Sequence, residues 1–267
     1  MNNLPDIQNS KNNIFQVDVD YVGIKNVKYP ILIKQKWDKK FQHTTGTFSL
    51  YCDLHKEQRG AHLSRFIEIL NKEIPLVVNI NSLHEIVKEI SLVQESETSQ
   101  LEVMFKYFIP KTSPVSKLTS LLDYDTAFYL SYDHIDTDFY ISVSVPITTL
   151  CPCSKEISEY NAHNQRAKLT ITILQSSTNE NEYIWIEDLV EIAEKSCSSQ
   201  IYPLLKREDE KHVTETMYNN PLFVEDVVRL CAKYLDQKYS NNKYRIECES
   251  YESIHNHIAY ASVDNLD

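Results

Sequence analysis

One stretch of the sequence, residues 149–166, holds several side chains that could carry out chemistry. It reads TLCPCSKEISEYNAHNQR and includes Cys151, Cys153 and His163. A thiolate and an imidazole suit a borderline-soft metal such as zinc. Two cysteines separated by one residue are also common in protein cores, so the spacing alone leaves both interpretations open. The variety of reactive groups gathered in this one segment favours a site.

Two further segments contain candidate side chains with ordinary alternatives. Residues 206–215 include Glu210 and are densely charged, a pattern typical of a solvated surface loop between two helices. His255 and His257 lie two residues apart, which places both on one side of an extended chain. That spacing is equally ordinary in a surface strand.

Glu225 lies in a helix that the sequence predicts from Pro221, because Asn220 can cap a helix and proline suits its first position. One residue corresponds to about 100° of helix rotation, so Glu225 borders the apolar stripe that Val224 begins. Asp226 should point to solvent. Glu225 could therefore be aimed at a ligand, or it could be an acidic residue that the helix dipole favours in a first turn.

The elements that position these side chains follow from the spacing of apolar residues. Alternation predicts strands near residues 48–54, 101–107, 141–147, 169–173, 244–248 and 257–263. Helical spacing predicts helices near 63–70, 83–93, 186–193 and 221–235. Two strands, two helices and two strands, given twice, indicate an α+β chain of two related modules, about 14–135 and about 136–267. We expect antiparallel sheets with the paired helices on one face.

The predicted strands also bring the central pair together. Cys151 continues the alternation of Val145 and Ile147, so the strand should deliver its sulfur toward the buried side. Pro152 prevents the strand from continuing. His163 lies directly before the next strand, so we expect the thiol and the imidazole to meet at a strand end.

Composition excludes several classes of protein. The 267 residues carry a formal net charge of −11, which disfavours nucleic acid and anionic membranes as partners. Met1–Asn13 has no apolar core of a secretory signal, and no apolar run approaches the roughly 20 residues that span a bilayer, so we expect a cytoplasmic protein.

With three glycines and no glycine-rich phosphate loop, any nucleotide must be held by side chains and ordinary turns. Six cysteines are too few for a disulfide scaffold.

Several motifs, in order, resemble those of the prokaryotic GTP cyclohydrolases of the IB type. They are GAHLSRF at 60–66, CPCSKEIS at 151–158, AHNQR at 162–166, DEK at 209–211, VTE at 213–215, NPLFVED at 220–226 and ESIHNH at 252–257. The departures are mild: the family's usual Gly is Asn161, its Thr is Ala61 and its Met is Leu63. Asparagine tolerates positive φ better than most residues, so the turn at Asn161 should survive.

The resemblance implies a fold and an assembly. The fold is the bimodular tunnelling fold, whose subunits assemble into a barrel-like homo-oligomer. We expect a tetramer, with active sites near subunit interfaces, so that one chain need not hold a complete site.

The resemblance also implies a reaction, the hydrolysis of GTP to 7,8-dihydroneopterin triphosphate and formate at the start of tetrahydrofolate biosynthesis. It places Cys151, His163, Glu210 and His255 at metal-site positions, with Cys151 and His163 as the catalytic pair, and makes Glu225 the guanine anchor. A divalent ion, whether zinc, manganese or iron(II), would activate water for attack on carbon 8 of guanine.

The triphosphate would need cations. Candidates in or beside the matched motifs are Arg65, Lys155 and Arg166, with Lys206, Arg207 and His62 as further possibilities. Taken singly, each of these is more often a structural or surface cation than a phosphate ligand.

Three alternatives stay open at this point. One is an archaeal-type cyclohydrolase with a cyclic phosphate product. Another is a nitrile reductase of the same fold, which uses a cysteine nucleophile and NADPH; retention of His163, Glu210 and His255 beside Cys151 favours the metal enzyme. The last is a purine-binding oligomer without catalysis.

Overall fold

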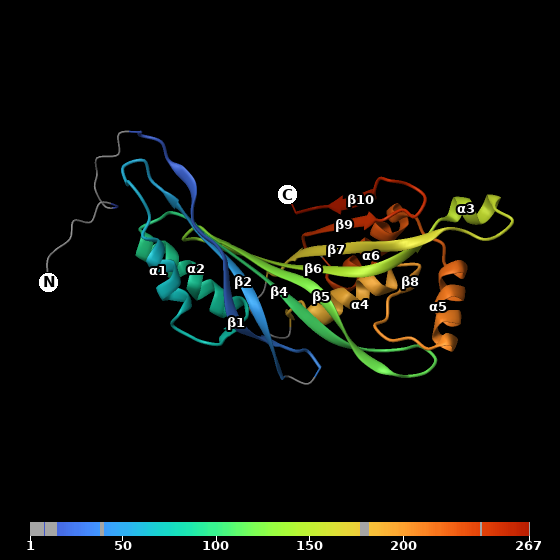
Figure 1. Cartoon of the computed structure of the whole chain (residues 1–267). Helices are drawn as coiled ribbons and strands as arrows, with labels where there is room; N and C mark the ends of the chain where they lie inside the picture. The colour runs from blue at the N-terminus through green and yellow to red at the C-terminus, as the bar shows by residue number, and fades with distance from the viewer. Residues whose placement is uncertain (1–7, 9–14, 38–39, 177–181, 241, 267) are drawn as a thin grey trace. The chain divides into compact units, whose positions relative to one another are not determined.

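The computed structural model describes residues 8, 15–37, 40–176, 182–240 and 242–266 (Figure 1). Apart from Gln8, the Met1–Asn13 segment, in which we expected no secretory signal, lies outside the described residues. Among the residues described, no helix is long and apolar enough to cross a membrane.

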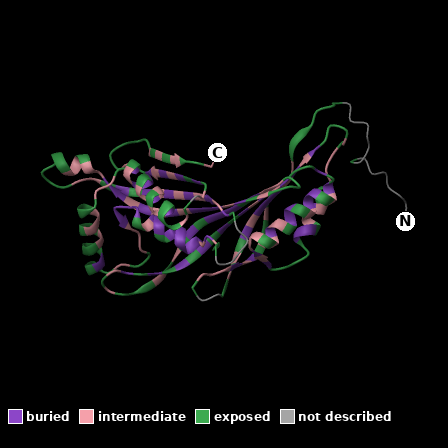
Figure 2. Ribbon diagram, turned by 180° about the vertical axis from the view of Figure 1, so that it is seen from behind, coloured by how far each residue is buried: buried purple, intermediate pink, exposed green. Residues whose placement is uncertain are grey.

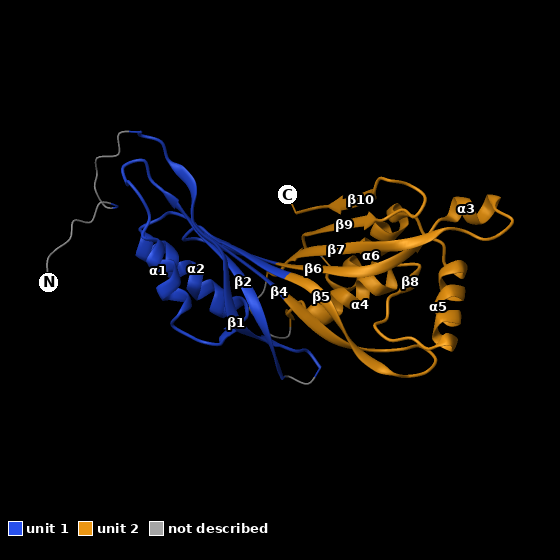
Figure 3. Ribbon diagram, in the orientation of Figure 1, with its two compact units in different colours: residues 1–105, 127–140 blue, residues 106–126, 141–267 orange. Residues whose placement is uncertain are grey.

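The chain forms two compact units, one of Met1–Phe105 with Ala127–Tyr140 and one of Lys106–Thr126 with Ile141–Asp267 (Figure 3). The sequence predicted two contiguous modules meeting near residue 135 instead. The difference arises because three long strands contribute to both units: β4 (Ser99–Thr112), β5 (Thr119–Tyr132) and β6 (Thr137–Leu150).

The first unit is a sheet with two helices. Its strands are β1 (Val19–Lys34), β2 (Phe41–Leu54) and β3 (Leu76–Val78), joined to β4 in the order β3-β1-β2-β4. β2 is antiparallel to β1 and β4, and β3 is parallel to β1. Helices α1 (Leu63–Leu70) and α2 (Ile80–Gln94) contact each other and this sheet. Close strand packing explains Gly23, since a Cβ there would lie 1.8 Å from the carbonyl oxygen of Leu50.

The second unit contains the candidate site. Strands β7 (Asn164–Leu174), β9 (Tyr244–Ser250) and β10 (Ala259–Asp264) follow β6 in the order β10-β9-β7-β6, and β8 (Ser199–Gln200) pairs with β6. The helices are α3 (Pro152–Ile157), α4 (Ile186–Lys195), α5 (Arg207–Asn219) and α6 (Val224–Lys238). α4 and α6 contact each other, and they pack against the strands.

Alternate residues of β7 show which face of this sheet is covered. Ala167, Leu169, Ile171 and Ile173 are all buried, whereas the residues between them are not. Figure 2 shows that buried positions alternate with less buried ones along the strands. α6 contributes Val227, Val228, Cys231 and Leu235 to the same core. The α+β class and the helical stripe that the sequence predicted are therefore confirmed, whereas the second unit contains helices α3 and α5 in addition to the two helices that the sequence predicted there.

Three local predictions were wrong. Residues 206–215 form most of helix α5 rather than a loop. Helix α6 begins at Val224 rather than Pro221, because Asn220 ends α5 and its side-chain amide donates to Cys197 O at 2.9 Å. Asp226 is not simply solvated, since its carboxylate accepts from Phe223 N at 3.1 Å and so caps α6.

A buried carboxylate explains why the charged segment is helical. Asp209 is fully buried and accepts four hydrogen bonds, from Lys206 N at 2.8 Å, Val115 N at 2.8 Å, Ser116 N at 2.9 Å and Ser116 Oγ at 2.6 Å. It thus caps α5 and fastens it to the β4–β5 connection. Burial alone would raise the pKa of Asp209, but these hydrogen bonds lower it far below its usual range.

The folded-state pKa of Asp209 lies below its unfolded value of about 3.9, so its stabilising effect is complete above that pH and fades as the pH falls below it. We predict that Asp209→Asn lowers the melting temperature at pH 7 and that the deficit relative to wild type shrinks below about pH 4. Thermal unfolding across this range is the measurement. Glu208→Gln, which changes an exposed neighbour, is the control; an equal loss there would contradict the assignment.

Candidate functional site

The candidate site begins where β6 ends and β7 starts. Cys151 N donates to the carbonyl oxygen of His163 at 3.1 Å, so the two residues lie side by side as the sequence predicted (the strands and α3 are labelled in Figure 1). Pro152 is the first residue of α3, and Ser154 N donates to Cys151 Sγ at 3.4 Å. Ser154 Oγ also accepts from His163 N at 3.3 Å and donates to Cys151 O at 3.2 Å, which ties the two segments together.

The turn between them has the backbone that the sequence predicted. Asn161 has a φ of 94°, the positive region that asparagine tolerates better than residues with bulkier side chains. The turn therefore survives the departure from glycine, and it returns the chain so that His163 faces Cys151.

The six cysteines fall into two groups. Cys52, Cys197, Cys231 and Cys248 are buried, and burial raises the pKa of Cys52 to about 11 and of Cys197 and Cys248 to about 12. These thiols stay protonated and serve the core. Cys151 is half-buried and Cys153 is exposed, so these two can meet a ligand.

The His163 ring is held on one side. Its Nδ1 lies 2.9 Å from Gln165 Oε1 and 3.8 Å from Glu252 Oε2. The side chains of His163 and Glu252 are only 15% and 14% exposed. The sequence did not single out Gln165 or Glu252, although both lie in the quoted motifs. The position of Gln165 two residues after His163 was an available signal, whereas no local spacing links Glu252 to His163.

The other predicted ligands lie on exposed parts of the second unit. Glu210 is exposed on α5, Glu225 is exposed in the first turn of α6, and His255 is exposed in the turn after β9. His255 stacks on His257, with ring centroids 4.8 Å apart. Within the described residues, no three His, Cys, Asp or Glu side chains gather closely enough to hold a metal ion. The donor chemistry fits a metal, and in the part of the chain that the structure describes, the backbone pairing places Cys151 next to His163 with no third such ligand gathered beside them.

The three candidate cations have different surroundings. Arg65 belongs to the first unit, where its Nη1 donates to Val93 O at 2.7 Å. Lys155 Nζ donates to Tyr218 O at 2.6 Å and lies 4.3 Å from the centre of the Tyr218 ring, which joins α3 to the end of α5. Arg166 follows the buried Gln165, so it projects from the opposite face of β7. There it lines a cavity of about 520 Å³ together with Lys106, Lys168 and Tyr251.

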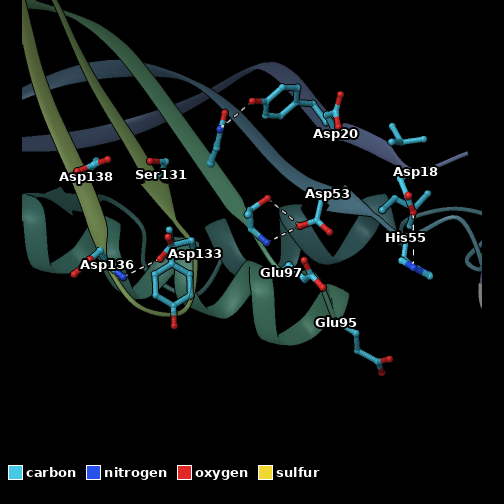
Figure 4. Close-up of a pocket in the computed structure, with 16 residues that line it drawn as sticks. Asp18, Asp20, Asp53, His55, Glu95, Glu97, Ser131, Asp133, Asp136 and Asp138 are labelled. Atoms are coloured by element: carbon cyan, nitrogen blue, oxygen red, sulfur yellow. Dashed lines mark hydrogen bonds and ion pairs between the residues drawn. The ribbon is translucent and has the colours of Figure 1, made fainter. Parts of the chain in front are cut away.

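A second cavity, of about 800 Å³, lies in the first unit (Figure 4). Among the residues that the structure describes, its lining contains His55, no lysine or arginine, and eight carboxylates: Asp18, Asp20, Asp53, Glu95, Glu97, Asp133, Asp136 and Asp138. Such a concentration of negative charge repels polyanions. We therefore exclude this cavity as a binding site for a triphosphate.

Comparison with known proteins gives a consistent picture. Residues 4–261 match the family described as type I GTP cyclohydrolase folE2. A protein named GTP cyclohydrolase FolE2 from Thermosipho africanus is 46% identical over 249 residues, which cover 93% of each chain. GTP cyclohydrolase FolE2 2 from Dechloromonas aromatica is 42% identical over 98% of this chain and 94% of its own.

Urate oxidases are among the solved structures with the same fold. Urate oxidase from Bacillus sp. TB-90 superposes with a TM-score of 0.55 at 11% identity, covering 92% of this chain and 100% of its own. Uricase from Arthrobacter globiformis gives 0.52 at 6% identity, covering 92% and 93%. Urate oxidases have the tunnelling fold, so the predicted fold class is confirmed.

The contacts of Lys155 predict a structural role for this residue. We expect Lys155→Met to lower the free energy of unfolding by about 1 kcal/mol, because a charged hydrogen bond and a cation–π contact are lost. Urea unfolding measures this, and Lys211→Met on α5 is the control, since the ion pair of Lys211 with Glu215, at 3.8 Å, is exposed to solvent. Unchanged stability together with weaker binding of triphosphate would show instead that Lys155 is a phosphate ligand.

Proposed function

This chain belongs to the type I GTP cyclohydrolase folE2 family and is a GTP cyclohydrolase, and on that premise we propose how its residues carry out the reaction. Water attacks carbon 8 of guanine, the imidazole ring opens, and a second hydrolysis releases formate. The ribose then rearranges and closes onto the freed pyrimidine amine with loss of one water, which gives 7,8-dihydroneopterin triphosphate for tetrahydrofolate biosynthesis in the cytoplasm. The observation that carries this proposal is the pairing of Cys151 with His163 at the end of β6.

We propose that a divalent metal binds at this pair. Thiolate and imidazole, completed by carboxylate, are donors that zinc, manganese and iron(II) all accept. Glu210 and His255 are the further ligands that the family motifs assign. When bound, the ion would supply a hydroxide nucleophile near neutral pH, since it lowers the pKa of water from about 15.7 to about 7.

The further ligands that the metal site needs support a homo-oligomer. Only Cys151 and His163 meet within one chain, and no set of three ligands forms among the residues described. A second copy of the chain would have to bring Glu210, His255 or both to the pair. We propose a barrel-like tetramer in which neighbouring copies share each site.

Each side chain has a role consistent with its chemistry. His163 either ligates the ion or moves a proton to the opening ring, since an imidazole can serve in either role. Glu225 accepts from the guanine ring N–H and the exocyclic amine together, a charge-assisted pair of bonds that selects guanine. Its exposure in the first turn of α6 leaves the carboxylate free to meet a ligand at the subunit surface. Arg166 remains a candidate for the triphosphate, as do Lys155 and Arg65 beside their protein contacts.

The direct test uses metal-stripped protein with GTP, with and without zinc, manganese or iron(II). We predict that added metal restores formate release and the fluorescence of the oxidised pterin. Cys151→Ala should abolish both while the protein stays folded, because a thiolate ligand is lost. Cys52→Ala is the control, since it removes a buried thiol of the first unit.

Two outcomes would redirect the proposal. Intact GTP under every metal, with folded protein, would contradict it in favour of the reductase or of purine binding alone. A cyclic phosphate in the phosphorus NMR spectrum of the product would identify the archaeal-type reaction instead.

Recognition of guanine gives a separate prediction. Glu225→Gln should lower kcat/KM for GTP about 30-fold or more, because a charge-assisted hydrogen bond is worth about 2 kcal/mol. Asp226→Asn is the matched control: it removes the neighbouring negative charge, while the amide oxygen can still accept from Phe223 N, so kcat/KM should change little. Equal kinetic losses in the two variants would contradict the anchor.

A further inference from the structure

A hydrogen-bonded network of buried polar side chains lies behind the His163 ring. It joins the ends of three neighbouring strands, with Thr149 on β6, Gln165 on β7 and Ser250 on β9, and it ends on Glu252. Thr149 is 2% exposed, Ser250 is 0% and Gln165 is 9%. Hydrogen bonds at such burial are strong, and an unsatisfied group there would be costly.

The distances fix the connections. Gln165 Nε2 lies 2.8 Å from Thr149 Oγ1 and 3.2 Å from Glu252 Oε1. Ser250 Oγ lies 2.8 Å from Glu252 Oε1, and Thr149 Oγ1 lies 3.0 Å from Ser250 Oγ. Gln165 Oε1 is left facing His163 Nδ1 at 2.9 Å.

The donor and the acceptor of each of these hydrogen bonds can be assigned in only one way. An ionised carboxylate only accepts, so Ser250 Oγ–H and one amide N–H of Gln165 both donate to Glu252. The Ser250 oxygen then accepts from Thr149 Oγ–H, and the Thr149 oxygen accepts the second amide N–H of Gln165. The reversed amide would set its oxygen against the Glu252 carboxylate. Gln165 Oε1 must therefore accept, and His163 Nδ1 must donate.

We propose that Gln165 is a positioning residue that fixes the neutral His163 ring with its proton on Nδ1 and its lone pair on Nε2, and that Glu252 fixes the amide of Gln165. This inference rests on the proposed function in one respect: the lone pair on Nε2 is what a metal ion or a transferring proton requires.

Glu252 reaches a second predicted ligand as well. Its carbonyl oxygen accepts from His255 N at 3.4 Å, in the turn that follows β9. Its carboxylate, 3.8 Å from His163 Nδ1, adds a favourable charge on the protonated side of the ring. The same residue thus orients His163 and shapes the turn that carries His255.

The test reads the tautomer directly. ¹⁵N NMR of the histidine-labelled, full-length, metal-free protein at about pH 8.5, where imidazole is neutral, should show His163 protonated at Nδ1. The His163 signals are assigned by their absence in His163→Asn. In Gln165→Met and in Glu252→Gln the ring should become a mixture of tautomers. Protonation at Nε2 in wild type, or an unchanged tautomer in both variants, would overturn the proposal.

Metal affinity is a second readout that needs no turnover. Titration with zinc alone should show an affinity about 10- to 100-fold weaker in Gln165→Met than in wild type. Gln175→Met is the matched control. Gln175 is also a buried glutamine, just beyond the far end of β7, and its Oε1 accepts from Ile184 N at 2.7 Å. Equal affinity in wild type and Gln165→Met, or an equal loss in Gln175→Met, would contradict a positioning role.

Failure of this inference is distinguishable from failure of the proposed function. If wild type does not release formate from GTP but shows the Nδ1 tautomer lost in both variants, the proposed reaction fails while the positioning role stands. If wild type turns over GTP and the tautomer never changes, the reaction stands and the positioning role fails.

Discussion

The hydrogen bond from Cys151 N to His163 O is the contact on which the candidate site depends. It continues the pairing of β6 and β7 beyond the two strands, so the register of a sheet sets the separation of a thiol and an imidazole. Pro152 ends the strand at the residue after the thiol, and Asn161 turns the chain back to the histidine. A sheet is a rigid support, and it holds these two groups in place whether or not a ligand is bound.

Two carboxylates of the second unit, those of Asp209 and Glu252, determine the local structure around them through the hydrogen bonds that they accept. Asp209 receives four hydrogen bonds and thereby decides where α5 begins, whereas Glu252 receives two and thereby decides which way Gln165 points. Both carboxylates act at a distance in sequence, Asp209 on Val115 across 94 residues and Glu252 on Gln165 across 87. Burial makes such contacts strong, and their directionality lets a few side chains orient a predicted metal ligand.

The periodic parts of the fold could be predicted from the sequence because burial repeats locally. β7 alternates, α6 has an apolar stripe, and each was visible in its own residues. Helix α5 was not, because Asp209 is the one buried residue in it and the contacts of that residue lie on the β4–β5 connection. The start of α6 was also predicted wrongly, because the side-chain amide of Asn220 donates to Cys197 O and Asn220 does not cap α6. The Cys151–His163 pair was predictable. The hydrogen-bonded network behind it was not, because it joins three strands that no local spacing connects.

The proposed mechanism requires Cys151 and His163 to hold a metal ion together, and X-ray absorption of the zinc-loaded, full-length protein tests that most directly. It predicts one sulfur neighbour at about 2.3 Å with nitrogen or oxygen neighbours at about 2.0–2.1 Å, and loss of the sulfur in Cys151→Ser. A first shell of nitrogen and oxygen alone, or a sulfur that survives in Cys151→Ser, would contradict the account.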